Sequence, residues 1–381
     1  MMYFLPYAAT SAMLSIMAFL YNRGSDRNRQ LITIACFLYF IFFFGFRGFI
    51  WHDWQNYYLL FKDMTMYDFE INPFMGGNEH FYEPGYVLLN IFVKHIYNDY
   101  ILFQVIQTTI CCVLLFRFML KRGLNVPFFL LLFLSFFGYE MLINLMRNSI
   151  SILIILNALE YIEDRKPVKY FLMCLLALTF HISSIVYLPL YWILNLKVNR
   201  WVFLGVFLSG AVFFLMHGKL LSPLIAMATG NDSRIEIMIG IYGKLDEAKT
   251  LSLGFFERMA TGLLVFGYYG KLLEMNPKNR IYINALLLYL AILFFFNEMS
   301  TVSLRLGMLV VFGYWMIYYQ LPEVFFFKNN KVLFCTIVMM YCLVKTSIYN
   351  VSGLYEYENY LFGCRSYEES VHRFYKMESD D

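Results

Sequence analysis

The stretch that decides the fold is NLMRNSISILIILNALEYIEDRKPVKYFLMCLLALTFHISSIVYLPLYW, which runs from Asn144 to Trp192. It contains two apolar runs that can enter a bilayer as helices, with a short charged connector between them. Arg147 opens the first run and His181 interrupts the second. An ionisable group at mid-membrane costs about 2.5–3.5 kcal/mol on insertion scales, so both residues are candidates for function. The structural alternative is an interfacial arginine whose head reaches water, together with a packed, hydrogen-bonded histidine.

The composition of the whole chain is that of a polytopic membrane protein. Hydrophobic residues make up 60% of the 381 residues, and charged residues only 15%. The apolar runs are close to the length that spans a bilayer. The net charge of +3 is small and the sequence has no basic stripe, so we do not expect a nucleic acid partner. The seven cysteines imply neither a structural zinc site nor a disulfide framework.

These runs predict an all-α fold with about ten to twelve transmembrane helices, forming a single transmembrane domain over residues 1–350. A shorter apolar segment, Tyr86–Tyr97, is predicted as a re-entrant or interfacial helix. The predicted spans outside the central hairpin are Tyr3–Tyr21, Leu31–Phe49, Tyr100–Leu120, Val126–Ile143, Met146–Ile162, Trp201–Met216, Leu253–Leu273, Ile281–Phe296, Thr301–Leu321 and Val332–Tyr349.

The distribution of basic residues predicts which side each loop occupies. Both flanks of Val168–Leu196 are basic, so this run is predicted as a hairpin of two short helices that turns near His181 and keeps both flanks in the cytoplasm. The same rule puts two large loops, residues 51–99 and 218–252, on the outer side, together with the C-terminal tail 351–381.

This topology brings several arginines to one outer level. They are Arg47, Arg147, Arg258 and Arg305. Each is weak as a signal by itself, because arginine is common at membrane ends. A group of them opposite the leaflet where basic residues gather favours a site for lipid-linked phosphate or pyrophosphate, which guanidinium groups bind in a bidentate manner.

Aromatic residues in the first outer loop suggest a sugar site. Trp54, Tyr57 and Tyr58 lie close to Asp53, and aromatic faces beside carboxylates suit carbohydrate. The alternative for each aromatic residue is an interfacial belt at the membrane surface.

A series of short motifs resembles the EpsG family of bacterial polysaccharide polymerases, which are similar to Wzy-type O-antigen and capsule polymerases. The order and spacing of the motifs carry the resemblance, which covers about residues 30–320. The family commonly has Arg-Gln where this chain has Arg147-Asn148, and Arg305 within SLRLGMLVVFGY is a looser match. The motifs are Phe46-Arg47, Asp53, Tyr57-Tyr58, Glu83-Pro84-Gly85-Tyr86, Arg147-Asn148, Phe180-His181-Ile182-Ser183-Ser184 and Leu188-Pro189-Leu190-Tyr191.

The resemblance implies a GT-C-like, multi-pass protein of the bacterial inner membrane that polymerises glycans at the periplasmic face. The donor would be a glycan on undecaprenyl pyrophosphate, and the acceptor would be one lipid-linked repeat unit. Arginines would bind the pyrophosphate, and His181 is the first candidate for the general base, with Asp53 and Glu83 as alternatives. We expect no cofactor and no metal, with a divalent ion at Asp53 and Glu83 as the alternative. A chain-length regulator protein is a further expected partner, beside membrane lipid.

Other functions fit many of the same features. A repeat-unit flippase or another transporter would also need arginines for pyrophosphate, although clear internal repeats are missing from the sequence. A GT-C glycosyltransferase that adds a single sugar differs from a polymerase mainly in processivity. An acyltransferase acting on the polysaccharide fits less well, because His181 lacks a convincing partner motif.

Overall fold

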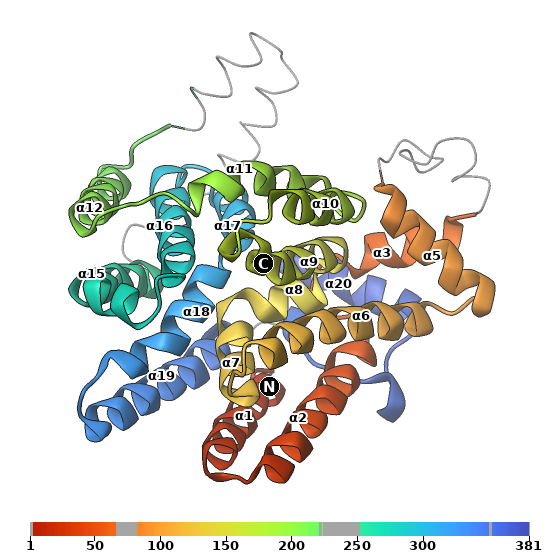
Figure 1. Ribbon diagram of the computed structural model, residues 1–381. Coiled ribbons are helices and arrows are strands. Elements are labelled where there is room, and N and C mark those ends of the chain that lie inside the picture. The colour runs from red at the N-terminus through yellow and green to blue at the C-terminus, as the bar shows by residue number, and fades with distance from the viewer. Residues whose placement is uncertain (1–2, 66–81, 221–222, 224–251, 350–352, 381) are drawn as a thin grey trace. The chain divides into compact units, whose positions relative to one another are not determined.

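The computed structural model describes residues 3–65, 82–220, 223, 252–349 and 353–380 (Figure 1). Over these residues the regular structure is helical, and the one β-type pairing among them is an isolated bridge between Arg47 and Asn359. The predicted all-α class is confirmed. The outer loop predicted over residues 218–252 lies almost entirely outside the described residues.

The chain forms two compact units. The first comprises residues 1–188 and 332–381, and the second comprises residues 189–331, with the chain passing between them inside α11 (Tyr187–Ile193). Among the described residues, the helices of the first unit are α1 (Leu5–Arg23), α2 (Asp26–Phe40), α3 (Trp54–Asp63), α5 (Pro84–Ile96), α6 (Tyr100–Lys121), α7 (Val126–Phe133), α8 (Tyr139–Ile143), α9 (Met146–Glu163), α10 (Pro167–Leu178), most of α19 (Lys328–Tyr349) and α20 (Tyr367–Asp380).

The second unit is smaller and is also helical. It contains a bent pair, α17 (Ser300–Met308) and α18 (Phe312–Gln320), whose axes differ by 59° across a short break. The sequence predicted one continuous helix over Thr301–Leu321, and this prediction is corrected to two helices. The helices described in the second unit are α12 (Arg200–Leu215), α15 (Leu253–Met275), α16 (Asn279–Phe295), α17 and α18.

Several helices are long and apolar enough to cross a membrane. Four described spans meet this criterion, and the bent pair in the second unit would be a fifth. Four further apolar helices among the described residues are shorter, at 10–17 residues, and the total of about ten to twelve crossings stays a prediction. The first unit places one span at its centre and others at its surface: 89% of the span 126–143 is buried, against 17% of the α19 span.

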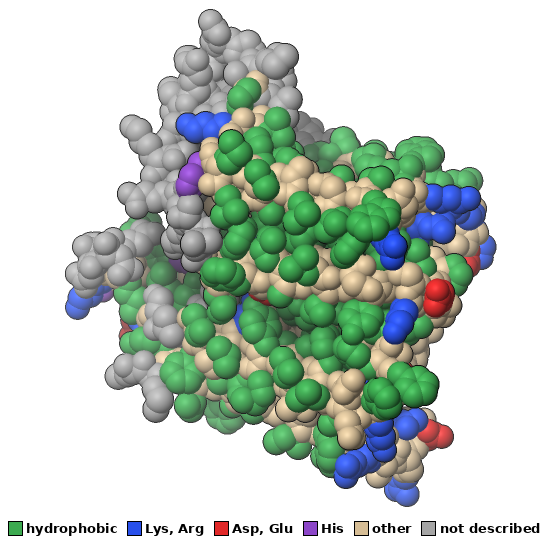
Figure 2. Space-filling view, turned by 90° about the vertical axis from the view of Figure 1, so that its left-hand side faces the viewer, with side chains coloured by type: hydrophobic (Ala, Val, Ile, Leu, Met, Phe, Trp, Pro, Cys, Tyr) green, Lys and Arg blue, Asp and Glu red, His purple; other side chains and the backbone are tan. Residues whose placement is uncertain are grey.

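The surface carries the apolar side chains that a bilayer would cover. Figure 2 shows hydrophobic side chains over most of one face, with lysine and arginine gathered towards its margins. On α19 the exposed apolar residues are Val332, Leu333, Ile337, Met340, Val344 and Ile348. The protein is therefore a multi-pass membrane protein.

The central span of the first unit is broken. Between α7 and α8 lies a π-helical segment, Leu134–Gly138, in which Phe137 adopts a positive φ of 71°. At Gly138 an added Cβ would lie only 2.5 Å from the carbonyl oxygen of Phe133, so a larger residue does not fit. Such π-segments often occur at functional sites in helices.

The predicted break near His181 is confirmed. α10 ends at Leu178, a 3₁₀ turn η3 covers Ile182–Val186, and α11 follows. The amide of Gly85 at the start of α5 donates to the Thr179 carbonyl at 2.7 Å, and a Cβ at Gly85 would lie 2.5 Å from Thr179 Oγ1. Glycine is thus required here, and the contact brings residue 83 next to the His181 turn. Whether both arms return to one side of the membrane stays a prediction.

Candidate functional site

An ion pair between a partly exposed arginine and a buried glutamate forms the centre of the candidate site. Arg147, the second residue of α9, donates from Nη1 to Glu83 Oε2 at 2.8 Å. The Glu83 side chain is only 3% exposed, whereas that of Arg147 is 23% exposed. The other carboxylate oxygen of Glu83, Oε1, accepts a hydrogen bond from the Ile182 amide at 2.9 Å. Glu83 therefore joins the starts of α5, α9 and η3.

Arg147 keeps hydrogen-bonding capacity beyond this ion pair. A guanidinium has five N–H donors, and Arg147 Nε has no hydrogen-bond partner among the described residues. Its charge lies over the ring of Tyr82, 5.2 Å from the ring centroid. A partly exposed guanidinium fixed on one side by a buried carboxylate is well arranged to bind an anionic oxygen.

Tyr57 of α3 lies beside Arg147. Burial raises the pKa of Tyr57 to about 12, while the positive charge of Arg147 partly opposes that rise. The phenol therefore stays protonated at neutral pH, so its hydroxyl can donate a hydrogen bond. The nearby charge of Asp53 also raises the pKa of Tyr57, which places Asp53 in the same electrostatic neighbourhood.

Asp53 is held at the start of α3 through its backbone. The amides of His52 and Asp53 both donate to Asn144 Oδ1, at 3.3 Å and 2.8 Å. Asn144 Nδ2 in turn donates to Glu140 Oε1 at 2.8 Å. The Asp53 side chain is half-buried. The polar end of the α8–α9 connection thus fixes the loop that carries Asp53.

His181 is the N-cap residue of η3. Its Nδ1 accepts a hydrogen bond from the Ser183 amide at 3.1 Å. A neutral imidazole that accepts through Nδ1 carries its proton on Nε2, so it meets a neighbour as a donor. Action as a general base would require the ring to release the Ser183 amide.

Arg47, a predicted phosphate ligand, occupies a different environment from Arg147. It is buried, and its guanidinium donates to the carbonyls of Phe44 and Ile143, the latter at 3.1 Å. The carbonyl of Arg47 accepts from Gln104 Nε2 at 2.8 Å. In this geometry Arg47 ties the π-helical segment Ile41–Gly45, which follows α2, to the end of α8.

The two remaining predicted arginines belong to the second unit. Arg258 is half-buried in α15 and lies over the ring of Phe294 at 5.9 Å. Arg305 is exposed in the last turn of α17. The phosphate-binding role of both stays a prediction.

The aromatic residues predicted to bind sugar divide into two groups. Tyr57 faces Arg147, but Trp54 and Tyr58 pack against the C-terminal helix α20. The ring of Tyr58 stacks on Tyr367 with centroids 4.1 Å apart, and Trp54 meets Tyr367 edge to face at 5.6 Å.

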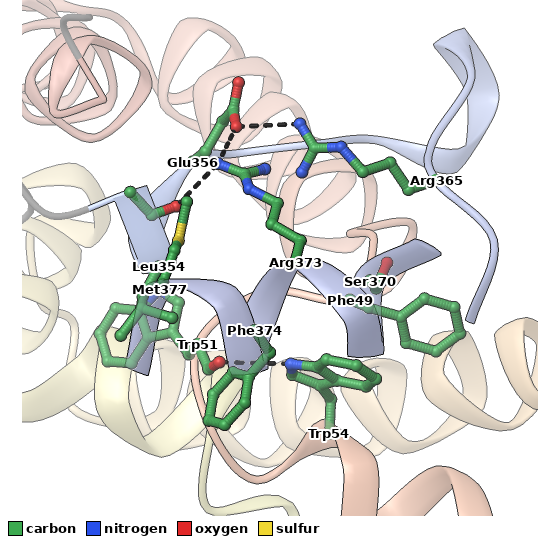
Figure 3. Close-up of a pocket in the computed structure, with 11 residues that line it drawn as sticks. Phe49, Trp51, Trp54, Leu354, Glu356, Arg365, Ser370, Arg373, Phe374 and Met377 are labelled. Carbon is green, nitrogen blue, oxygen red and sulfur yellow. Dashed lines mark hydrogen bonds and ion pairs between the residues drawn. The ribbon is translucent and has the colours of Figure 1, made fainter. Parts of the chain in front are cut away.

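The C-terminal segment that provides this cover is held by ion pairs. Figure 3 shows a small pocket beside Trp51, Trp54 and Phe374, in which Glu356 lies between the guanidinium groups of Arg365 and Arg373. The amide of Gly48 also donates to the Glu358 carbonyl at 2.9 Å. Residues predicted as a separate outer tail thus pack as part of the first unit.

The structure therefore brings together Asp53, Tyr57, Glu83, Arg147 and His181 within the first unit. Our sequence analysis assigned no role to Asn148 and Ser183, which bond to each other beside His181. Their position in the quoted motifs was the available signal. Among the described residues no group of three or more His, Cys, Asp or Glu is placed to hold a metal ion.

Of the comparisons with known proteins, only the comparison with family models gives a match. No curated protein and no solved structure matches the chain. The model of the EpsG family matches residues 29–362, which include the whole of the site in the first unit and exclude α20. The chain belongs to the EpsG family.

Proposed function

We propose that this protein polymerises undecaprenyl-pyrophosphate-linked oligosaccharide repeat units into a surface polysaccharide at the periplasmic face of the inner membrane. Membership of the EpsG family supports a role as a polysaccharide polymerase in general. The observation that carries the proposal further is the partly exposed Arg147, held by buried Glu83 and bordered by Tyr57 and Tyr82. This site presents a partly exposed guanidinium with aromatic neighbours on a multi-pass membrane protein.

The proposed reaction transfers the growing glycan from one lipid carrier to another. The bond between the anomeric carbon of the donor and its pyrophosphate oxygen breaks, and undecaprenyl pyrophosphate leaves as an anion. A hydroxyl of the acceptor repeat unit attacks the anomeric carbon, forms the new glycosidic bond and loses its proton to a base. Arg147 stabilises the charge that develops on the leaving pyrophosphate.

We assign the remaining roles from the hydrogen bonds of each group. Both Glu83 oxygens already accept hydrogen bonds, from Arg147 and from the Ile182 amide, so Glu83 serves to position Arg147. Asp53, half-buried at the start of α3, is our candidate for the base that receives the acceptor proton. His181 contacts the reacting groups as a hydrogen-bond donor through Nε2.

The test is chain extension by the purified protein in nanodiscs, using a lipid-linked repeat unit as both donor and acceptor. Arg147→Lys retains the charge but loses the planar fork, so we expect a fall in extension rate of at least about 100-fold. Arg27→Lys changes an exposed arginine in the first turn of α2 and should extend normally.

Other functions give different products in this assay. A flippase would move the lipid-linked unit across the bilayer without making a longer glycan, and a single-sugar transferase would stop after one addition from a monosaccharide donor. Either result with wild-type protein contradicts the proposal. Normal extension by Arg147→Lys would contradict bidentate recognition of pyrophosphate. In cells, deletion should leave one repeat unit on its acceptor, whereas loss of a flippase would leave none.

A further inference from the structure

Three polar contacts hold the turn that carries His181. Glu83 accepts from the Ile182 amide, as described above. Asn148 Oδ1 on α9 accepts a hydrogen bond from Ser183 Oγ at 3.1 Å. One helical turn further along, Ser151 bonds to Ser184, and both of these hydroxyls are buried. The same face of α9 thus holds the turn at two successive positions.

Ser183 connects Asn148 to the imidazole. Its hydroxyl is bound by Asn148, and its backbone amide donates to His181 Nδ1 at 3.1 Å. A shift of the serine hydroxyl therefore moves the amide that fixes the ring. Asn148 is buried, with 6% exposure, and directly follows Arg147, so one turn of α9 holds both the guanidinium and, through Ser183, the imidazole.

We propose that Asn148 is a positioning residue for His181, acting through Ser183 to keep Nδ1 as the acceptor and to leave Nε2 as the nitrogen that meets the substrate. This inference rests on the proposed transferase function. An imidazole ring released from the Ser183 amide can rotate or adopt the other tautomer. Only a fraction of the protein molecules would then present the Nε2–H donor to the substrate. The lipid-linked substrate would still bind, because Arg147 and Glu83 do not depend on the Asn148–Ser183 bond.

The central experiment compares two asparagines of the same helix. Asn148→Leu removes the acceptor for Ser183 while keeping the number of side-chain heavy atoms and the branched shape. Asn157→Leu is the matched control, because Asn157 lies on α9, is also 6% exposed, and donates to the carbonyls of Leu114 and Leu153, both at 2.9 Å. In chain extension we expect Asn148→Leu to lower kcat about 10- to 100-fold with KM changed less than about threefold. Asn157→Leu should lower the melting temperature and leave kcat within about twofold.

Ser183→Ala tests whether the effect passes through the serine. It removes the hydroxyl but keeps the amide, so it should lower kcat in the same way as Asn148→Leu. The double variant Asn148→Leu/Ser183→Ala should then be no slower than either single variant, because both changes break one interaction. Multiplicative losses, or equal kcat losses in Asn148→Leu and Asn157→Leu, would overturn the proposal.

A spectroscopic measurement separates this inference from the proposed function. ¹⁵N NMR of histidine-labelled protein reports the tautomer of His181, with the signal assigned by its absence in His181→Asn. We expect the Nε2-protonated form in the wild type and in Asn157→Leu, and a mixture of tautomers in Asn148→Leu. An unchanged tautomer in Asn148→Leu refutes positioning whether or not the protein extends glycans. If wild-type protein fails to extend them but the tautomer shifts as expected, the positioning stands and the transferase function falls.

Discussion

Arg47 and Arg147 carry the same guanidinium group but use its hydrogen bonds for different purposes. Arg47 donates to two backbone carbonyls in a buried setting, whereas Arg147 pairs with one carboxylate and stays partly exposed. A buried group that holds carbonyls stabilises the fold, since each unsatisfied carbonyl costs about 1–3 kcal/mol. An exposed donor fixed by a partner can instead bind an anion.

This difference predicts that a change of arginine to lysine lowers stability at position 47 and activity at position 147. Arg47→Lys leaves at least one of the Phe44 and Ile143 carbonyls without its donor and should lower the melting temperature by several degrees. Arg147→Lys keeps an ammonium near Glu83 and should melt within about two degrees of wild type while losing extension. Thermal unfolding in one detergent measures both variants. A stable but inactive Arg47→Lys would instead assign Arg47 to substrate.

Substituting His181 by asparagine and by glutamine distinguishes its structural role as the N-cap of η3 from its role in the reaction. The oxygen of asparagine can take the place of Nδ1 and accept from the Ser183 amide, because asparagine is a good N-cap residue. His181→Asn should therefore keep the melting temperature but lower kcat by about 100-fold or more. His181→Gln reaches further, to the region of Nε2, and should lose less activity and more stability. Full activity in His181→Asn would reduce His181 to a structural cap.

The sequence singled out the residues of this site individually but not their partners. Arg147 and His181 are visible in sequence because ionisable groups are rare in apolar runs. The environment of an ionisable residue is not visible in the sequence. The burial of Arg47, for example, depends on a contact with α8, almost a hundred residues away. The cover over Trp54 and Tyr58 could not be foreseen either, since it comes from Tyr367 at the far end of the chain.

Among the elements, the continuous helices and the break near His181 were predicted closely, whereas the breaks after Leu134 and between α17 and α18 were not. α6 and α9 begin at the predicted residues because their apolar runs have clear polar ends. The break after Leu134 has no proline, and its cause is local backbone geometry around Phe137 and Gly138, which hydropathy does not report. Such breaks therefore cannot be predicted from hydropathy. They depend on the packed structure, in which neighbouring helices satisfy the backbone groups that lose their hydrogen bonds at the break.

The C-terminal helix α20 gives a prediction at this scale. Its Tyr367 stacks on Tyr58 and touches Trp54. Both residues belong to α3, which also carries Tyr57 beside Arg147 of α9. An aromatic pair contributes about 0.5–1.5 kcal/mol beyond its buried area. Tyr367→Ala should therefore loosen α3, lower the melting temperature and weaken chain extension. The measurement is thermal unfolding together with extension rate.

The matched control for this prediction lies on the same helix. Tyr375→Ala removes a tyrosine that is 59% exposed, so it should leave both quantities unchanged. If Tyr367→Ala instead accelerates extension, α20 acts as a cover that restricts access to Trp54 and Tyr58, and its support of α3 is of minor importance.

For the whole molecule, the membrane explains the pattern of exposure. Helices α2 and α19 of the first unit leave apolar side chains on the surface, whereas the span 126–143 is almost fully enclosed. In water such exposed patches would aggregate, but in lipid they are the stable arrangement. The class of the protein therefore followed from composition alone, while the division into two units depends on contacts that composition does not encode.

The sides of the membrane provide the last prediction. Arg165 and Lys166 end the turn after α9, and Lys197 and Arg200 follow α11, so the positive-inside rule puts both clusters in the cytoplasm. The break at Thr179–His181 supplies the turn that such an arrangement requires. Single cysteines at Arg165 and Asn199, in protein whose own cysteines are replaced by serine, should both resist a membrane-impermeant maleimide added to intact spheroplasts and react after lysis. A cysteine at Cys364, retained as the only native one, should react before lysis if the C-terminal segment is outside. Labelling of Asn199→Cys in intact spheroplasts would make α10 and α11 a single broken crossing, and His181 would then lie within the membrane rather than at its outer surface.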